Sequence, residues 1–251
     1  MHPSLEAVGL VPALALGIAA LRPSRERALA AAAALVLIFA AFVTELQQLA
    51  THTFLWAHLL QNVVLAEWAP ALLVLAVPSD RLQRIRIPML PALVAWLATY
   101  FVWHLPVVYD AALRRPHTLL HVEHLPYLIA GVALWWPVIR GSRPSAVKAL
   151  YLFAAFVLAS PLGLLLALIP RAIYPFYVHA PRTWGPRPLA DQQIAGVTMA
   201  LEQAAVFFAV FALYLRRFLR EEQREPELLR LSGGGTGRPA HHELERQQLR
   251  P

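Results

Sequence analysis

The sequence is organised around residues 103–124, WHLPVVYDAALRRPHTLLHVEH. This stretch holds four of the ten histidines and two acidic residues, and long apolar runs lie on either side of it. In a helix, His117, His121 and His124 have the spacing i, i+4 and i+7, which puts them on one face. A row of histidines at the end of an apolar helix predicts a polar site at the mouth of a hydrophobic bundle.

The composition is typical of a membrane protein. Hydrophobic residues make up 58% of the 251 positions, whereas soluble domains have about 45–50% on a comparable count. Apolar runs recur along the chain, each long enough to cross a hydrocarbon core as a helix of ~20 residues. We therefore expect an all-α polytopic fold of seven transmembrane helices, at about residues 5–21, 28–49, 54–77, 89–108, 117–139, 149–169 and 192–215.

The distribution of Lys and Arg predicts how these helices are oriented. Of the 22 basic residues, 17 lie in the loops after the first, third and fifth helices or in the carboxyl-terminal tail. The positive-inside rule then puts the amino terminus outside and the carboxyl terminus in the cytoplasm. This placement also explains the net charge of +7 without a nucleic-acid partner. We expect a transmembrane domain over residues 1–220 and a charged, disordered cytoplasmic tail over residues 221–251.

With this orientation, seven histidines from five segments face the extracytoplasmic side. Imidazoles from several helices can bind a transition metal, with carboxylates or amides completing the site. The absence of cysteine excludes disulfides and thiolate ligands. One histidine alone would also be explained as an amphipathic residue at the headgroup level, but the cluster favours a metal site. The four candidate ligands are His58, His104, His121 and His124.

Other polar residues are weaker candidates for the same site. Glu123 lies between two of the histidines and can orient a neighbouring group, His117 also fits the simple start of a helix, and His179 lies in a long loop as an accessory ligand. Deeper in the membrane, Glu67 and Glu202 lie near the expected midplane. On the last helix, Asp191 and Glu202 lie on one stripe, and Gln192 lies on the adjacent stripe. These deeper groups fit either a polar path into the bundle or an interhelical hydrogen-bond network.

Several strings of the sequence resemble a known family. They are HLLQ (58–61) leading into APALLVL (69–75), WHLPVVYDAAL (103–113), HVEH (121–124) leading into WWP (135–137), YPFY (174–177) and ADQQ (190–193). Over about residues 40–215 the chain is similar to the bacterial CtaG family of seven-span cytochrome c oxidase assembly factors. The second and third strings carry most of the resemblance.

The resemblance implies a non-enzymatic role in maturing a haem-copper oxidase in the bacterial plasma membrane. Copper would be held on the extracytoplasmic side and passed to an oxidase subunit or a soluble copper carrier. The positions that match family histidines are His58, His104, His121 and His124. The supporting positions are Asp110, Glu123 and Asp191. Where the family usually carries His-Met-x-x-His-Met, this chain reads HLLQNV over residues 58–63, so Asn62 is either a replacement ligand or a sign of loss.

Two other functions fit the same residues. A membrane-embedded metalloenzyme would use zinc or iron to activate water or oxygen, with Glu123 or Asp110 as acid and base. A haem-binding membrane protein would use two of the histidines as axial ligands. A metal analysis and an absorption spectrum of the purified protein distinguish the three functions.

Overall fold

The computed structural model describes residues 9–78, 84–115 and 119–233, and these residues form helices and loops without any strand. The all-helical prediction is confirmed for this part of the chain. His117 and the tail beyond residue 233 lie outside the described residues.

The first half of the chain forms helices that follow one another closely. They are α1 (Val11–Ala20), α2 (Arg25–Val43), α3 (Glu45–His52), α4 (Leu55–Val63), the π-helix η2 (Val64–Trp68) and α5 (Ala69–Ala76). The second half contains α6 (Met89–Trp103), α7 (Pro106–Leu113), α8 (Leu119–Ile139), α9 (Ser145–Leu168), α10 (Pro175–His179) and α11 (Pro188–Gly233).

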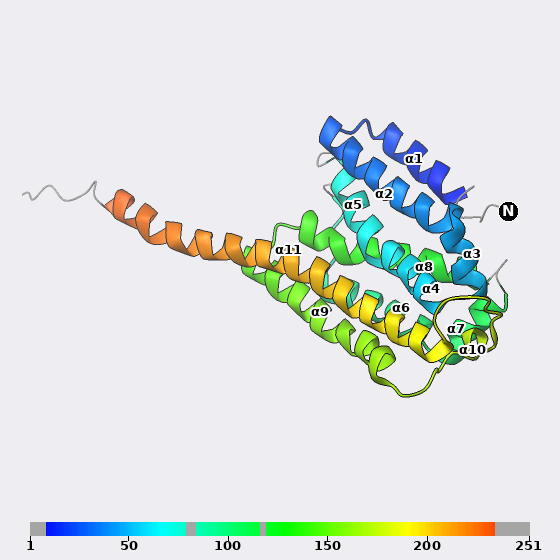
Figure 1. Ribbon diagram of the computed structural model, residues 1–251. Coiled ribbons are helices and arrows are strands. Elements are labelled where there is room, and N and C mark those ends of the chain that lie inside the picture. Colours follow the sequence, from blue (N-terminus) through cyan, green and yellow to red (C-terminus); the bar gives the residue numbers. More distant parts are fainter. Residues whose placement is uncertain (1–8, 79–83, 116–118, 234–251) are drawn as a thin grey trace, which may run out of the picture.

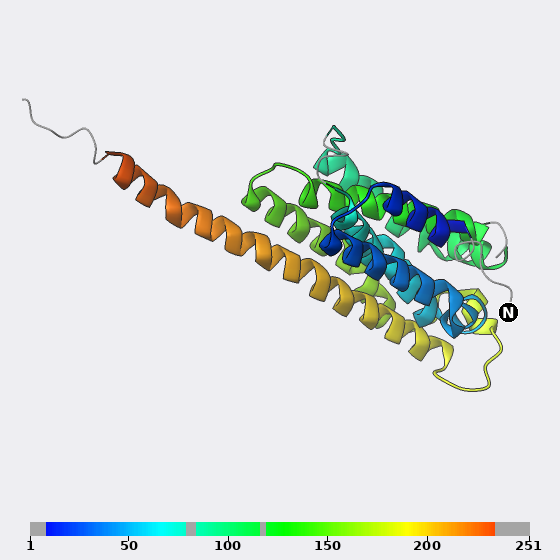
Figure 2. The ribbon, with the colours of Figure 1, turned by 90° about the horizontal axis from the view of Figure 1, so that it is seen from above.

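The long helices run side by side in one bundle (Figure 1). Helices α1 and α2 lie on one side of it, and α9 and α11 lie together on the other. In both views, the carboxyl-terminal part of α11 projects well beyond the rest of the bundle (Figure 2). The continuous segment of α4, η2 and α5 contacts α2, α8 and α11, so it forms the centre of the bundle.

Five described helices are long and apolar enough to cross a membrane, and a sixth crossing results if α6 and α7 are counted together. Helix α1 is apolar but has only ten residues, and the first residues of the predicted span 5–21 lie outside the described part. A membrane protein is therefore supported. The total of seven crossings and the orientation remain predictions.

Two predicted spans are broken in the structure, which corrects their boundaries. The span expected at 28–49 ends at Val43, because Thr44 adopts an extended backbone and its hydroxyl accepts a hydrogen bond from Leu46 N (3.2 Å) to start α3. The span expected at 89–108 ends at Trp103, and α7 follows at an angle of 72°. Pro106 has no N–H to continue the ladder, so the break lies just before it.

This second break moves a predicted site residue. Asp110 was expected in the connection between the predicted spans 89–108 and 117–139, but it lies inside α7, where it is buried. At the other end of the chain, α11 continues past residue 220 to Gly233. Residues 221–233 are therefore helical rather than disordered, whereas the boundary of the domain itself stays a prediction.

The bundle is tight because small residues allow backbones to approach. A Cβ added to Gly196 on α11 would lie 2.5 Å from Ala167 N and 2.6 Å from Gly163 O on α9. A Cβ added to Gly131 on α8 would lie 2.4 Å from Ala66 O in η2. Close helix packing at small residues is a common means of association in membranes, where apolar burial gives little driving force.

Candidate functional site

Three of the four predicted ligands come together near the end of the bundle where α7 and α10 lie. His58 is on α4, His104 ends α6, and His124 is on α8. All three are buried. The rings of His58 and His124 meet edge to face with centroids 6.2 Å apart, and the ring of Tyr109 lies 4.9 Å from His58 and 5.9 Å from His104. We call these three histidines the histidine cluster.

Hydrogen bonds determine which ring nitrogen of His104 carries the proton. Its Nδ1 lies 2.7 Å from the carbonyl oxygen of Tyr100, and the hydroxyl of Tyr127 is 3.1 Å from the same nitrogen. A carbonyl oxygen can only accept, so Nδ1–H donates to it. In the neutral ring, Nε2 of His104 then carries a lone pair, and this buried atom has no hydrogen-bond partner among the described residues.

His58 is held in the same tautomer by a tyrosine. The hydroxyl of Tyr177 donates its one hydrogen to Ala50 O (2.5 Å), so it accepts from Nδ1–H of His58 (3.0 Å). Burial raises the pKa of Tyr177, which keeps this hydroxyl protonated. The Nε2 atom of His58 is left with a lone pair and likewise has no hydrogen-bond partner among described residues.

An acid and an amide complete the polar surface next to His58. Glu123 on α8 is fully buried, and its Oε1 lies 3.7 Å from His58 Nε2 and accepts a hydrogen bond from Asn62 Nδ2 (3.1 Å). The second oxygen of Glu123, the amide oxygen of Asn62 and the hydroxyl of Tyr109 are buried without a hydrogen-bond partner in the described structure. Glu123 and Asn62, two of the predicted supporting residues, therefore lie beside His58, and their role at a metal site stays a prediction.

The described residues stop short of a complete metal centre. Among them, no group of three or more histidines and acids is arranged to hold a metal ion. The side chain of His121 lies outside the described part of the chain, as does the whole of His117. His179 is exposed, its Nδ1 donates to Pro175 O (2.7 Å), and it contacts none of the three histidines of the cluster.

Asp110, Asp191 and Gln192 anchor the segments around the cluster. The carboxylate of Asp191 accepts from the first N–H groups of α4, Leu55 N (2.9 Å) and Trp56 N (3.1 Å). Asp110 accepts from Phe176 N at the start of α10 (3.1 Å), and Gln192 accepts from Ile173 N (2.7 Å). These side chains satisfy helix-end and loop N–H groups that have no other partner.

A second polar network lies deeper in the bundle. Glu67, on the π-helix η2, is fully buried and accepts from Gln203 Nε2 (3.1 Å), which also donates to Tyr100 Oη (2.9 Å). Trp68 Nε1 donates to Glu202 (2.6 Å), whose carboxyl group lies close enough to that of Glu67 to interact with it electrostatically. The sequence left two interpretations of Glu67 and Glu202, a polar path into the bundle or an interhelical network. The hydrogen bonds favour an interhelical network between η2, α6 and α11.

Sequence reasoning missed the tyrosines that position the histidines. Tyr100, Tyr127 and Tyr177 bond to ring nitrogens of the cluster, and Tyr174 Oη donates to the backbone oxygen of His104 (3.0 Å). Tyr100 and Tyr127 share an apolar run with His104 and His124, which was a weak signal, whereas the run of His58 contains no tyrosine. Their pairing was invisible, since Tyr177 and His58 are 119 residues apart.

One family model matches most of the chain. It is described as "Cytochrome c oxidase caa3 assembly factor (Caa3_CtaG)" and covers residues 12–221, which include every residue of the site described above. No curated protein and no solved structure matches the chain.

Proposed function

The chain belongs to the cytochrome c oxidase caa3 assembly factor family, and on that premise we propose that it handles copper for the oxidase through the histidine cluster. Copper is the cargo here: the cluster would take it up and release it to an oxidase component or to a soluble carrier. The family description favours a non-catalytic role, and the apolar helices favour a multi-pass place in the bacterial plasma membrane.

The observation that carries this proposal is the state of two buried nitrogens. The Nε2 atoms of His58 and His104 are unprotonated in the neutral rings, while the other nitrogen of each ring donates to a fixed oxygen. Metal-binding histidines almost always show this pattern, because the second hydrogen bond fixes the tautomer and makes the ligand more basic. A histidine that serves only packing would gain from bonding both nitrogens.

The nature of the donors suggests the oxidation state. Imidazole nitrogens with the carboxylate of Glu123 and the amide oxygen of Asn62 form an N/O set, which suits Cu(II). Thioether ligands, which suit Cu(I), are scarce, since the chain has only three methionines. We therefore expect Cu(II) to bind more tightly than Cu(I).

Burial of the cluster supports transient, gated loading. Tyr174 and Tyr177 belong to the segment between α9 and α11, and their hydroxyls bond to His104 O and Ala50 O. These bonds hold the segment next to the cluster, and we expect an ion that enters or leaves to displace it. A delivery factor with a covered site would release copper only when a partner opens it.

The test is a copper titration of the purified protein with matched histidine variants. The variant His58→Ala/His104→Ala is compared with His52→Ala/His179→Ala, in which two exposed histidines are removed. Copper affinity, measured against a competing chelator, should fall at least about 100-fold in the first variant and stay unchanged in the second. In cells, only the first should fail to restore oxidase activity and copper content.

Equal copper affinity in both variants, with both proteins folded, would contradict the proposal. Stoichiometric zinc or iron in the purified protein would favour a metalloenzyme, and a Soret band would favour haem.

A further inference from the structure

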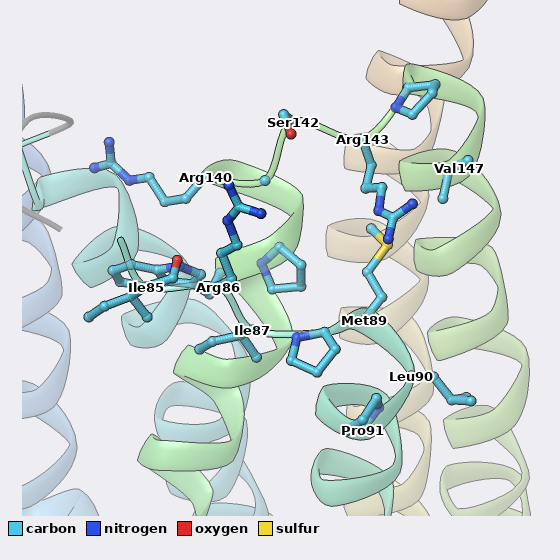
Figure 3. Close-up of a pocket in the computed structure, with 15 residues that line it drawn as sticks. Ile85, Arg86, Ile87, Met89, Leu90, Pro91, Arg140, Ser142, Arg143 and Val147 are labelled. Carbon is cyan, nitrogen blue, oxygen red and sulfur yellow. The ribbon is translucent and has the colours of Figure 1, made fainter. Parts of the chain in front are cut away.

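A hollow lies at the end of the bundle opposite to the histidine cluster, where α8 ends and α6 and α9 begin. It has a volume of about 1010 Å³ and lies between the segment before α6, the start of α6 and the loop from α8 to α9 (Figure 3). Trp136 at its wall donates from Nε1 to Ile85 O (3.1 Å), which fixes one of these segments to α8. The fold therefore defines the position of this wall of the hollow.

The lining is strongly cationic. Arg140 is committed to the fold, since its guanidinium donates to Val74 O (2.8 Å) and Val77 O at the end of α5. Arg86 and Arg143 are exposed and make no hydrogen bond or ion pair with any described residue. In Figure 3, Arg86 points toward the end of α8, and Arg143 points down toward Met89. Two guanidinium groups of the lining are therefore not engaged by any part of the chain that the structure describes.

No acidic residue belongs to the described lining to balance this charge. Glu221, on the neighbouring helix α11, accepts a hydrogen bond from Ser145 Oγ (2.8 Å) and does not line the hollow. Two helices also begin here: α6 after Pro88 and α9 after Pro144, neither with a side-chain cap. Their first N–H groups and the positive ends of their dipoles favour an anion as well.

The hollow continues into a surface suited to acyl chains. Leu90 and Val94 on α6 are 70% and 56% exposed, and Val147 and Leu150 on α9 are 41% and 67% exposed. The spacings i, i+4 and i, i+3 put each pair on one face of its helix. Since α6 and α9 contact each other and α9 is long and apolar enough to cross a membrane, we expect these side chains to face the hydrocarbon next to the hollow.

We propose that this hollow binds the phosphate headgroup of an anionic phospholipid, with Arg86 and Arg143 as its ligands and α6 and α9 as the wall for its acyl chains. Basic pockets at the ends of membrane helices bind such headgroups. A zwitterionic lipid would bring an ammonium group into a hollow whose described lining has no carboxylate to receive it. Phosphatidylglycerol and cardiolipin fit this charge.

The experiment measures lipid binding to the full-length protein in detergent by native mass spectrometry. Phosphatidylglycerol, cardiolipin and phosphatidylcholine are titrated separately into wild type, Arg86→Gln/Arg143→Gln and the control Arg171→Gln/Arg187→Gln. The control arginines are exposed at the other end of the bundle, near the end of α9 and the start of α11. Arg140 is kept, because its removal would free the carbonyl groups at the end of α5.

We expect wild type to prefer the anionic lipids. The affinity for them should fall ~10–30-fold in Arg86→Gln/Arg143→Gln, at about 1 kcal/mol for each arginine near a headgroup, and not in the control. Equal binding of phosphatidylcholine, or an equal loss in the control, would overturn the proposal. Displacement of the lipid by low concentrations of inorganic phosphate would overturn it in favour of a free anion.

Discussion

Asp191 allows the sharpest test of how the histidine cluster is held. It is fully buried at the start of α11, and its two carboxylate oxygens accept from Leu55 N, Trp56 N and the guanidinium of Arg182 (3.0 Å). Leu55 and Trp56 open α4, and His58 follows one turn later. One carboxylate therefore ties α4, the helix that carries His58, to α11.

The structure gives the size of the effect of Asp191→Ala. Each helix-start N–H left unpaired and buried costs about 2 kcal/mol. Arg182 keeps bonds to Pro186 O (2.7 Å) and Tyr177 O (2.9 Å), so it loses only part of its stabilisation. We expect Asp191→Ala to lower the free energy of unfolding by ~4 kcal/mol, with Asp191→Asn intermediate because its amide still offers one acceptor. For a chain of this size, the melting temperature should fall by roughly 10 °C.

The assay is unfolding of the detergent-solubilised protein by added SDS, followed by tryptophan fluorescence. The comparison variant is Arg182→Gln, which removes the ion pair and the bonds to Pro186 O and Tyr177 O but leaves both N–H contacts of Asp191. It should therefore cost less than Asp191→Ala, about 2–3 kcal/mol. If Asp191→Ala costs less than ~1 kcal/mol, or if Arg182→Gln costs as much as Asp191→Ala, the capping role is wrong.

Two further predictions follow from the packing and from the tautomer of His58. Gly196→Ala should separate α9 from α11 and cost ~2–3 kcal/mol in the same SDS titration, whereas Gly17→Ala, with open space around it, should change stability little; equal effects would contradict the close approach. Tyr177→Phe should lower copper affinity ~10–100-fold and move the proton of His58 toward Nε2, visible in the ¹⁵N chemical shifts of its ring by solid-state NMR. Unchanged shifts and affinity would show that Tyr177 does not set the tautomer.

The helices could be predicted because their signal is local. Apolar runs and their flanking charges placed α8, α9 and α11 to within a few residues of their starts, since a span must be continuous and apolar to satisfy its backbone in lipid. The breaks at Thr44 and before Pro106 were missed. Both divide one predicted span into two helices, and hydropathy alone does not record such a break.

The candidate site was predicted only in part, for a similar reason. The residue types that bind metals are few, so His58, His104 and His124 could be picked out, and the structure brings them together. The roles of Asp110 and Asp191 could not be seen, because their partners are backbone N–H groups of α10 and α4. Any residue has such a group, and only the fold decides which ones lack a partner.

Tyr100 joins the two polar regions that the sequence presents as separate. Its backbone oxygen accepts from His104, and its hydroxyl accepts from Gln203, which also donates to Glu67. Glu67 lies on the π-helix η2, a form of helix that is frequent at functional sites. The indole of Trp96, on the same helix as Tyr100, donates to Ala66 O in η2 (3.3 Å). Helix α6 is thus bonded to the end of the bundle that holds the histidines and to the deep acids at once. A shift of α6 that moves His104 must therefore also strain the hydrogen bonds of Glu67.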